Sequence, residues 1–217
     1  IVVNPQKEQV KRTKPGETIV TEIEQLARMY PYAEPVELKV KSVVNFVTQS
    51  IGFSQVQRLE EAILYVLKGT MNEQMFTEFL EKPYLMGGVG IHKEEVPAIT
   101  KRVFHLLRYS LDVQRFRSEV NADDAFIHQQ KFVERLMMYL KEEIGFQATQ
   151  EQILTLREAV TDRVGGIIDA VQFAQRLILT KELGGASFDD RTADKIAVHM
   201  EKLIAQGGYV ILPNELE

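Results

Sequence analysis

Four histidines are the side chains best suited to proton transfer or metal binding, because the chain of 217 residues contains no cysteine. None of them stands in a His-x-x-x-His or Glu-x-x-His pattern, the spacing that places two metal ligands on one helix face: His92, His105, His128 and His199. Asp124 lies one helical turn before His128, and no third ligand accompanies that pair. The sequence therefore predicts no catalytic residues, no metal site and no cofactor.

A glycine-rich segment, Gly87-Gly88-Val89-Gly90, precedes a predicted helix, a position at which phosphate groups are often bound. It lacks the following Lys-Ser or Lys-Thr pair, the G-x-G-x-x-G pattern and the preceding hydrophobic strand of such phosphate loops. The later segment Gly184-Gly185 repeats only the two glycines. Both segments are therefore interpreted as tight connections between helices.

The charge of the chain disfavours nucleic-acid binding. The formal net charge is −5, whereas binding to phosphate backbones requires a basic surface. The helix expected after each glycine turn begins with carboxylates, Glu94-Glu95 and Asp189-Asp190, which would repel phosphates. Basic residues are concentrated in an N-terminal arm that carries Lys7, Lys11, Arg12 and Lys14. This arm is either a plain surface extension or a tether to an acidic partner, and nucleic-acid binding through it is the alternative function.

Methionine and aromatic side chains gather in one irregular region. They are Met71, Met75, Phe76, Phe79, Tyr84, Leu85 and Met86. Such residues either pack as core between the two halves of the chain, which is the commoner role, or form an adaptable groove for a partner helix. Methionine suits the second role because its side chain repacks easily. We take these seven residues as the predicted partner-binding site, and Met137-Met138-Tyr139 as a second cluster with the same two interpretations.

Apolar spacing and glycine turns indicate an internal repeat. Ile51-Gly52-Phe53 returns as Ile144-Gly145-Phe146 after 93 residues, and Gly87-Gly88 returns as Gly184-Gly185 after 97. At the first offset, apolar positions recur as follows: Val40, Val43, Val44 and Val47 correspond to Val133, Leu136, Met137 and Leu140. At the second, Ile91, Val96, Ile99, Val103, Leu106 and Leu107 correspond to Phe188, Ala193, Ile196, Met200, Leu203 and Ile204. We infer one helical unit used twice, with about four residues gained inside the second copy.

Helical periodicity and terminal signals predict helices over residues 18–30, 36–50, 55–68, 72–81, from 93 past 105, 121–143 and 167–180. Residues 109–121 are expected to continue the preceding helix or to bend from it. Gly52 is expected to end a helix in the left-handed conformation, as is Gly145. Capping boxes are expected over residues 54–57 and 149–152.

The chain divides into four predicted segments. Residues 1–35 form a basic arm, a helix and a Pro-rich linker, residues 36–120 and 121–208 form the two repeats, and residues 209–217 form a strand-like tail. The tail could pair with residues 1–3, and its last two residues resemble a vector scar. The missing initial methionine suggests a fragment or a processed chain. The sequence has no membrane-length apolar run, signal-peptide pattern or cysteine, and these absences favour a cytoplasmic location.

These observations predict an all-α protein of two tandem repeats, each an approximately four-helix unit, with at most minor β pairing between the termini. The predicted function is a non-enzymatic scaffold or adaptor that binds other proteins, as part of a larger protein or assembly. An enzyme ranks third, after nucleic-acid binding, because no nucleophile–base pair or cofactor loop is present. The sequence indicates no oligomeric state.

Overall fold

The computed structural model describes residues 21–47, 51–118 and 125–207. The basic arm and the strand-like tail lie outside these residues, and so does the predicted pairing of the two termini. The described part of the chain contains helices and turns but no strand, which confirms the all-α class. In chain order the elements are α1 Thr21–Met29, α2 Pro35–Val47, α3 Phe53–Leu67, α4 Glu73–Glu81, the 3-10 turn η1 Tyr84–Met86, α5 Val96–Ser118, α6 Ala125–Ile144, α7 Gln150–Val164, α8 Ala170–Ile178, the 3-10 turn η2 Lys181–Leu183 and α9 Asp190–Gly207.

Local signals explain most helix ends. Asn72 caps α4 by accepting a hydrogen bond from the Met75 amide at 2.9 Å. Asp169 caps α8 in the same way through the Gln172 amide, so α8 begins at Ala170, three residues later than predicted. Pro97 occupies the first turn of α5, where it removes no helical hydrogen bond. From there α5 runs without a break to Ser118, so residues 109–118 continue the helix.

The prediction for Gly52 is wrong, whereas the prediction for Gly145 is confirmed. Gly145 has φ of 69°, the left-handed conformation that closes α6. Gly52 has φ of −67° and caps the start of α3. The Gln55 side chain accepts a hydrogen bond from the Gly52 amide at 3.1 Å, so the cap lies at Gly52 and not at the predicted Ser54. The second predicted box is confirmed, because Thr149 and Gln152 bond each other's amides at 3.2 and 3.0 Å.

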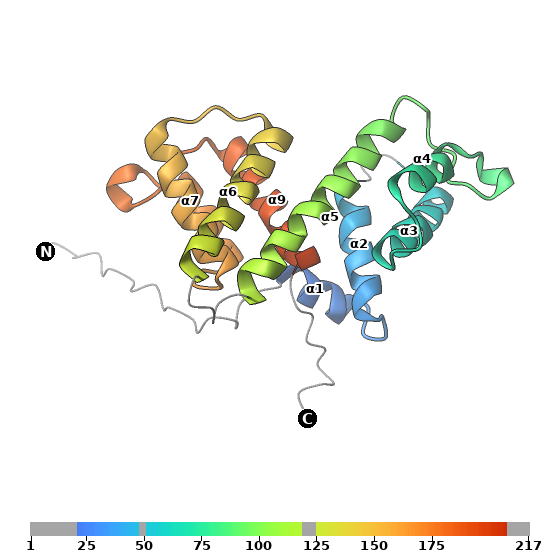
Figure 1. Ribbon diagram of the computed structural model, residues 1–217, viewed down its shortest axis with the longest axis horizontal. Coiled ribbons are helices and arrows are strands. Elements are labelled where there is room, and N and C mark those ends of the chain that lie inside the picture. Colours follow the sequence, from blue (N-terminus) through green and yellow to red (C-terminus); the bar gives the residue numbers. More distant parts are fainter. Residues whose placement is uncertain (1–20, 48–50, 119–124, 208–217) are drawn as a thin grey trace, which may run out of the picture.

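Helices α5 and α9 form the centre of an elongated molecule (Figure 1). Helices α2, α3 and α4 lie toward one end, and α6, α7 and α8 lie toward the other (Figure 1). Helix α2 packs on α9 as well as on α5, and α6 packs on α5 as well as on α9. Helices α5 and α9 therefore contact helices from both ends of the molecule, and a single hydrophobic core runs through both ends.

Helices α5 and α9 approach closely at Ser110 and Gly207. A Cβ atom on Gly207 would lie 2.2 Å from the Ser110 carbonyl oxygen and 2.8 Å from the Val113 Cβ. The missing side chain therefore sets how closely the two backbones approach. Ser110 is buried there, and its hydroxyl donates to the Leu107 carbonyl at 2.8 Å. Small residues at the crossing let the larger apolar side chains along both helices interlock.

We predict that Gly207→Ala destabilises the protein, although Ala is the better helix former by about 1 kcal/mol. The new methyl group would overlap the Ser110 carbonyl, and such overpacking costs about 1–3 kcal/mol. The free energy of unfolding, measured by urea denaturation, is expected to fall. Gly52→Ala is the matched control, because its Cβ would meet only the Gln55 side-chain oxygen at 3.4 Å. Equal losses for both variants would contradict the prediction.

Candidate functional site: two hairpin tips and a buried polar cluster

The seven predicted partner-binding residues divide between core and surface. Phe76 is fully buried, with its ring 5.7 Å from the Phe104 ring in an edge-on arrangement. Met71 and Phe79 are half-buried against the core. The remaining four are exposed: Met75, Tyr84, Leu85 and Met86. Only these four of the seven therefore lie on a surface that a partner could reach without rearrangement of the core.

The exposed residues gather around η1, which forms the tip of a hairpin between α4 and α5. Leu85 is 97% exposed and Met86 is 68% exposed. Gly87 follows in the left-handed conformation with φ of 87°. The tip is closed by backbone bonds, in which Val89 donates to Phe79 and Gly90 donates to Lys82. A fixed turn therefore holds two large apolar side chains in solvent.

At Gly88 the returning segment of this hairpin loop lies directly against the backbone of Lys82. A Cβ there would lie 2.1 Å from the Lys82 carbonyl oxygen, so no other residue fits without movement of the backbone. The loop is also tied to α3, because the Gln55 side chain donates to the Gly90 carbonyl at 3.1 Å. The sequence interpretation of the glycines as a tight connection is consistent with this geometry.

A second tip around η2 was missed by the sequence reasoning. Leu183 ends this turn, is 68% exposed and precedes the left-handed Gly184. A Cβ on Gly185 would lie 1.9 Å from the Leu179 carbonyl oxygen. The Gln152 side chain donates to the Ser187 carbonyl at 3.1 Å. The recurrence of Gly184-Gly185 in the sequence was the signal that could have located this tip.

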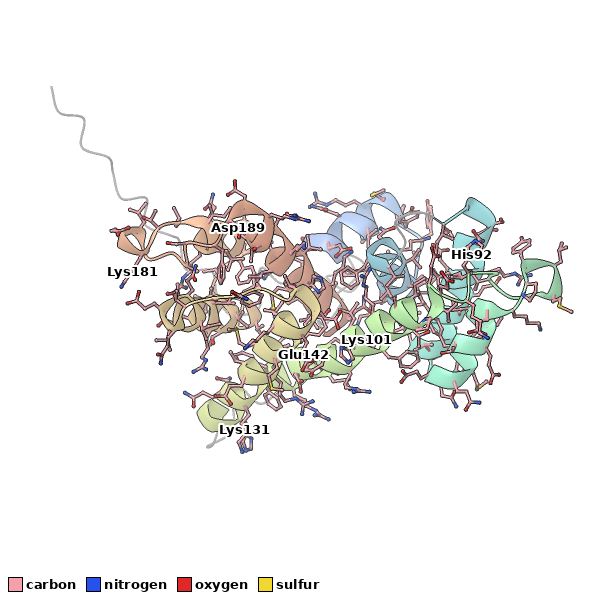
Figure 2. All side chains as sticks on the ribbon, turned by 90° about the horizontal axis from the view of Figure 1, so that it is seen from above. His92, Lys101, Lys131, Glu142, Lys181 and Asp189 are labelled. Carbon is pink, nitrogen blue, oxygen red and sulfur yellow. The ribbon has the colours of Figure 1, made fainter. Side chains whose placement is uncertain are left out.

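The two tips lie at opposite ends of the molecule (Figure 1), and Lys181 at the start of η2 marks one of these ends (Figure 2). Their neighbouring side chains differ in chemistry. Tyr84 and Leu85 stand where the second tip has Lys181 and Glu182. Lys181 forms an exposed ion pair with Glu151 at 2.6 Å. The first turn therefore carries no charged side chain, whereas two charged side chains precede the leucine of the second.

The second methionine cluster also divides. Tyr139 is fully buried in α6, whereas Met138 beside it is exposed and Met137 is half-buried. A single exposed methionine on the side of a helix is ordinary for a protein surface. This cluster therefore forms no continuous apolar surface.

Two adjoining hollows lie beside α2 and α3. One has a volume of about 640 Å³ and is walled partly by α1, and the other has a volume of about 560 Å³. They share Lys41, Gln57 and Glu60, and Lys41 pairs with Glu60 at 3.3 Å. Lys41 also lies 4.4 Å from the centre of the Tyr30 ring. The charged groups between the hollows are thus satisfied by one another.

A buried polar cluster lies where α2, α5, α6 and α9 meet. The Tyr139 hydroxyl and His199 Nδ1 are 3.1 Å apart. The His199 ring lies edge-on to Phe46 of α2, with centroids 4.9 Å apart. Arg102 of α5 lies 5.8 Å from the centre of the same Phe46 ring. The sequence reasoning treated His199 as an isolated histidine, because its neighbours come from distant segments.

Burial controls the protonation of this cluster. It lowers the pKa of His199 to about 4, so the imidazole is neutral near pH 7. Burial also raises the pKa of the Tyr139 hydroxyl, and the nearby Glu143 carboxylate adds to the increase. Glu143 lies 2.8 Å from Nδ1 of His105. Both members of the Tyr139–His199 pair are therefore neutral under ordinary conditions.

Other polar contacts join α7 to α9, α5 to α7 and α5 to α6. Buried Arg163 of α7 forms two bonds of 2.7 Å to the Glu201 carboxylate of α9. Arg117 donates to the Val164 carbonyl at 3.2 Å, and burial, with the nearby Arg163 charge, lowers its pKa. Asp112 is buried on α5 with its carboxylate 2.9 Å from Arg135 of α6, and desolvation raises its pKa. The two bonds to Glu201 explain how the buried Arg163 guanidinium is accommodated in the core.

The histidines do not converge on a metal site. His105 and His199 lie in the buried cluster, whereas His92 and His128 are exposed. Within the described residues no group of three His, Cys, Asp or Glu side chains is arranged to hold a metal ion. The same part of the chain contains no helix that is long and apolar enough to cross a membrane. Comparison of the chain with protein-family models, curated proteins and solved structures finds no match.

We predict that Arg163→Met destabilises the protein by about 3 kcal/mol, because it leaves the partly buried Glu201 without its bidentate partner. The free energy of unfolding from urea denaturation is the measurement. Lys181→Met removes an ion pair whose two side chains are both exposed, and little change is expected there. A loss for Arg163→Met no larger than for Lys181→Met would contradict the prediction.

Proposed function

We propose that the chain is two tandem copies of one helical unit and that it acts as a non-enzymatic scaffold or adaptor for protein partners. In this proposal the hairpin tip of each copy contacts a partner, and the shared core fixes the two tips at opposite ends of the molecule. The exposure of Met86 and Leu183 carries the proposal, because each is a large apolar residue at the same point of the same turn.

Matching contacts at a spacing of 97 residues support the two copies. Gln55 bonds the Gly90 carbonyl as Gln152 bonds the Ser187 carbonyl. Val89 donates to Phe79 as Ala186 donates to Arg176. Gly88 and Gly185 both lie against a backbone carbonyl. Ser110 and Gly207, which are also 97 residues apart, lie against each other where α5 crosses α9, as expected for two copies related by a two-fold axis.

Burial and helix caps support a gain of four residues within the second copy. Phe46 and Val47 of α2 are buried as are Tyr139 and Leu140 of α6, at a spacing of 93 residues. The helices that follow are capped by Gly52 and Thr149, which are 97 residues apart. The four additional residues of the second copy therefore lie between Leu140 and Thr149.

The tips support binding because a rigid turn keeps their apolar side chains exposed. Two exposed apolar residues at equivalent places, each before a left-handed glycine, are more informative than the same residues scattered over a surface. The different neighbours of Met86 and Leu183 favour different partners at the two ends.

We predict that Leu85→Glu with Met86→Glu abolishes capture of partners that bind the first tip and leaves the fold intact, because both side chains are exposed. Leu183→Glu is expected to abolish capture at the second tip. The measurement compares proteins recovered from the native extract by each variant, with identification by mass spectrometry. Met138→Glu, a change at an exposed methionine far from either turn in sequence, is the control and should retain every partner.

Nuclease treatment and deletion of residues 1–16 separate this function from the alternative. If the basic arm of Lys7, Lys11, Arg12 and Lys14 binds nucleic acid, recovery is lost with nuclease and with the deletion, whereas the tip variants behave like the unaltered protein. Recovery that survives nuclease but is insensitive to the tip variants would overturn the assignment of the tips.

A further inference from the structure

His199 lies at the meeting point of the four central helices. Its own helix is α9, the side chains that pack against it come from α2 and α6, and α5 packs on the α6 side chain. Helix α2 supplies the Phe46 ring, and α6 supplies Tyr139, whose hydroxyl is 3.1 Å from Nδ1. The Tyr139 ring lies in turn against Tyr109 of α5, with centroids 5.2 Å apart. His199 thus contacts α2 from one half of the molecule (α2 to α5) and α6 from the other half (α6 to α9).

The charged groups that face His199 oppose its protonation on balance. Arg102 of α5 and Lys195 of α9 are cations close enough to disfavour an imidazolium. Glu143 of α6 favours it, but this carboxylate is already bonded to His105 of α5 at 2.8 Å. Phe46 supplies no acceptor on the α2 side. Desolvation adds the largest cost, because the ring is packed between helices and not in open solvent.

We propose that His199 and the groups packed on it form an acid-sensitive joint between the two halves of the molecule. The four central helices hold their arrangement while His199 is neutral, and they separate more readily once its imidazole is protonated. This inference stands on the packing at the α2–α5–α6–α9 junction and is independent of the proposed partner binding.

The sign of the pH dependence follows from where protons bind. His199 has a pKa of about 4 in the packed state against 6.5 for a free imidazole. Between these values the separated state binds the proton and the packed state does not, so packing weakens as the pH falls. The effect is complete below about pH 4, where both states are protonated. The full change in the equilibrium constant for packing is on the order of 100-fold.

The test measures the distance between the two ends of the full chain. The protein has no cysteine, so Glu81→Cys in α4 and Gln175→Cys in α8 introduce two unique attachment points for spin labels on exposed positions. Pulsed electron paramagnetic resonance then gives the distribution of distances at about pH 7 and about pH 4.5. We expect a narrow distribution at the higher pH and a broader one at the lower pH.

His199→Gln provides the decisive comparison, because a glutamine can still bond Tyr139 but does not titrate. The doubly labelled His199→Gln protein is expected to keep a narrow distribution at both pH values. Broadening of the same size in this variant would overturn the proposal, and so would an unaltered protein that does not broaden. His105→Gln is the matched control at the neighbouring histidine and should broaden as the unaltered protein does.

A direct titration keeps the proposal testable if His199→Gln does not fold. The imidazole resonances of the unaltered protein, assigned by their absence from a His199→Asn variant or by through-bond experiments, report the His199 pKa. A value near 4 is expected. A value at or above 6.5 would overturn the proposal, because the packed state would then not disfavour the proton.

Discussion

The close approach of α5 and α9 is the constraint on which the rest of the structure depends. Gly207 lies against the Ser110 carbonyl without room for a side chain, so α5 and α9 cross with their backbones nearly in contact. That crossing brings α2 onto α9 and α6 onto α5. As a result α2 is buried on most of its circumference, including Leu38, Val43 and Phe46. The two ends of the molecule therefore share one hydrophobic core.

The same arrangement determines where polar groups are tolerated. At the junction of the four central helices, Tyr139 and His199 satisfy each other, and both remain neutral because burial disfavours their charged forms. Farther out, Arg163 is buried with its charge retained, because Glu201 accepts two bonds from its guanidinium group. A neutral pair costs less to bury than an ion pair but can be disrupted by a single proton. Protonation of His199 would therefore disturb the polar pair at this junction.

Local structure was predictable from the sequence to the extent that it depends on neighbouring residues. Helical periodicity located the helices, and the Thr149–Gln152 pair and Gly145 marked real helix ends. Gly52 misled because a glycine can either end one helix or cap the next, and the choice depends on the Gln55 side chain. The methionine and aromatic cluster could not be divided from sequence, since Phe76 and Leu85 are both apolar and only packing makes one core and the other surface. His199 was missed because Phe46 and Tyr139 reach it from separate helices.

The two hairpin tips separate what the backbone requires from what the side chains are free to vary. At Gly88 and Gly185 an added Cβ would lie only 2.1 and 1.9 Å from a backbone carbonyl oxygen, and Gly87 and Gly184 have a left-handed φ. The residues just before these glycines carry no such backbone constraint. There the first tip has Leu85, and the second has Glu182 at the corresponding position. A substitution at Leu85 or Met86 therefore changes the surface without changing the turn. Because the glycines hold each turn, the side chains of the two tips can differ in chemistry without a change in the conformation of the turn.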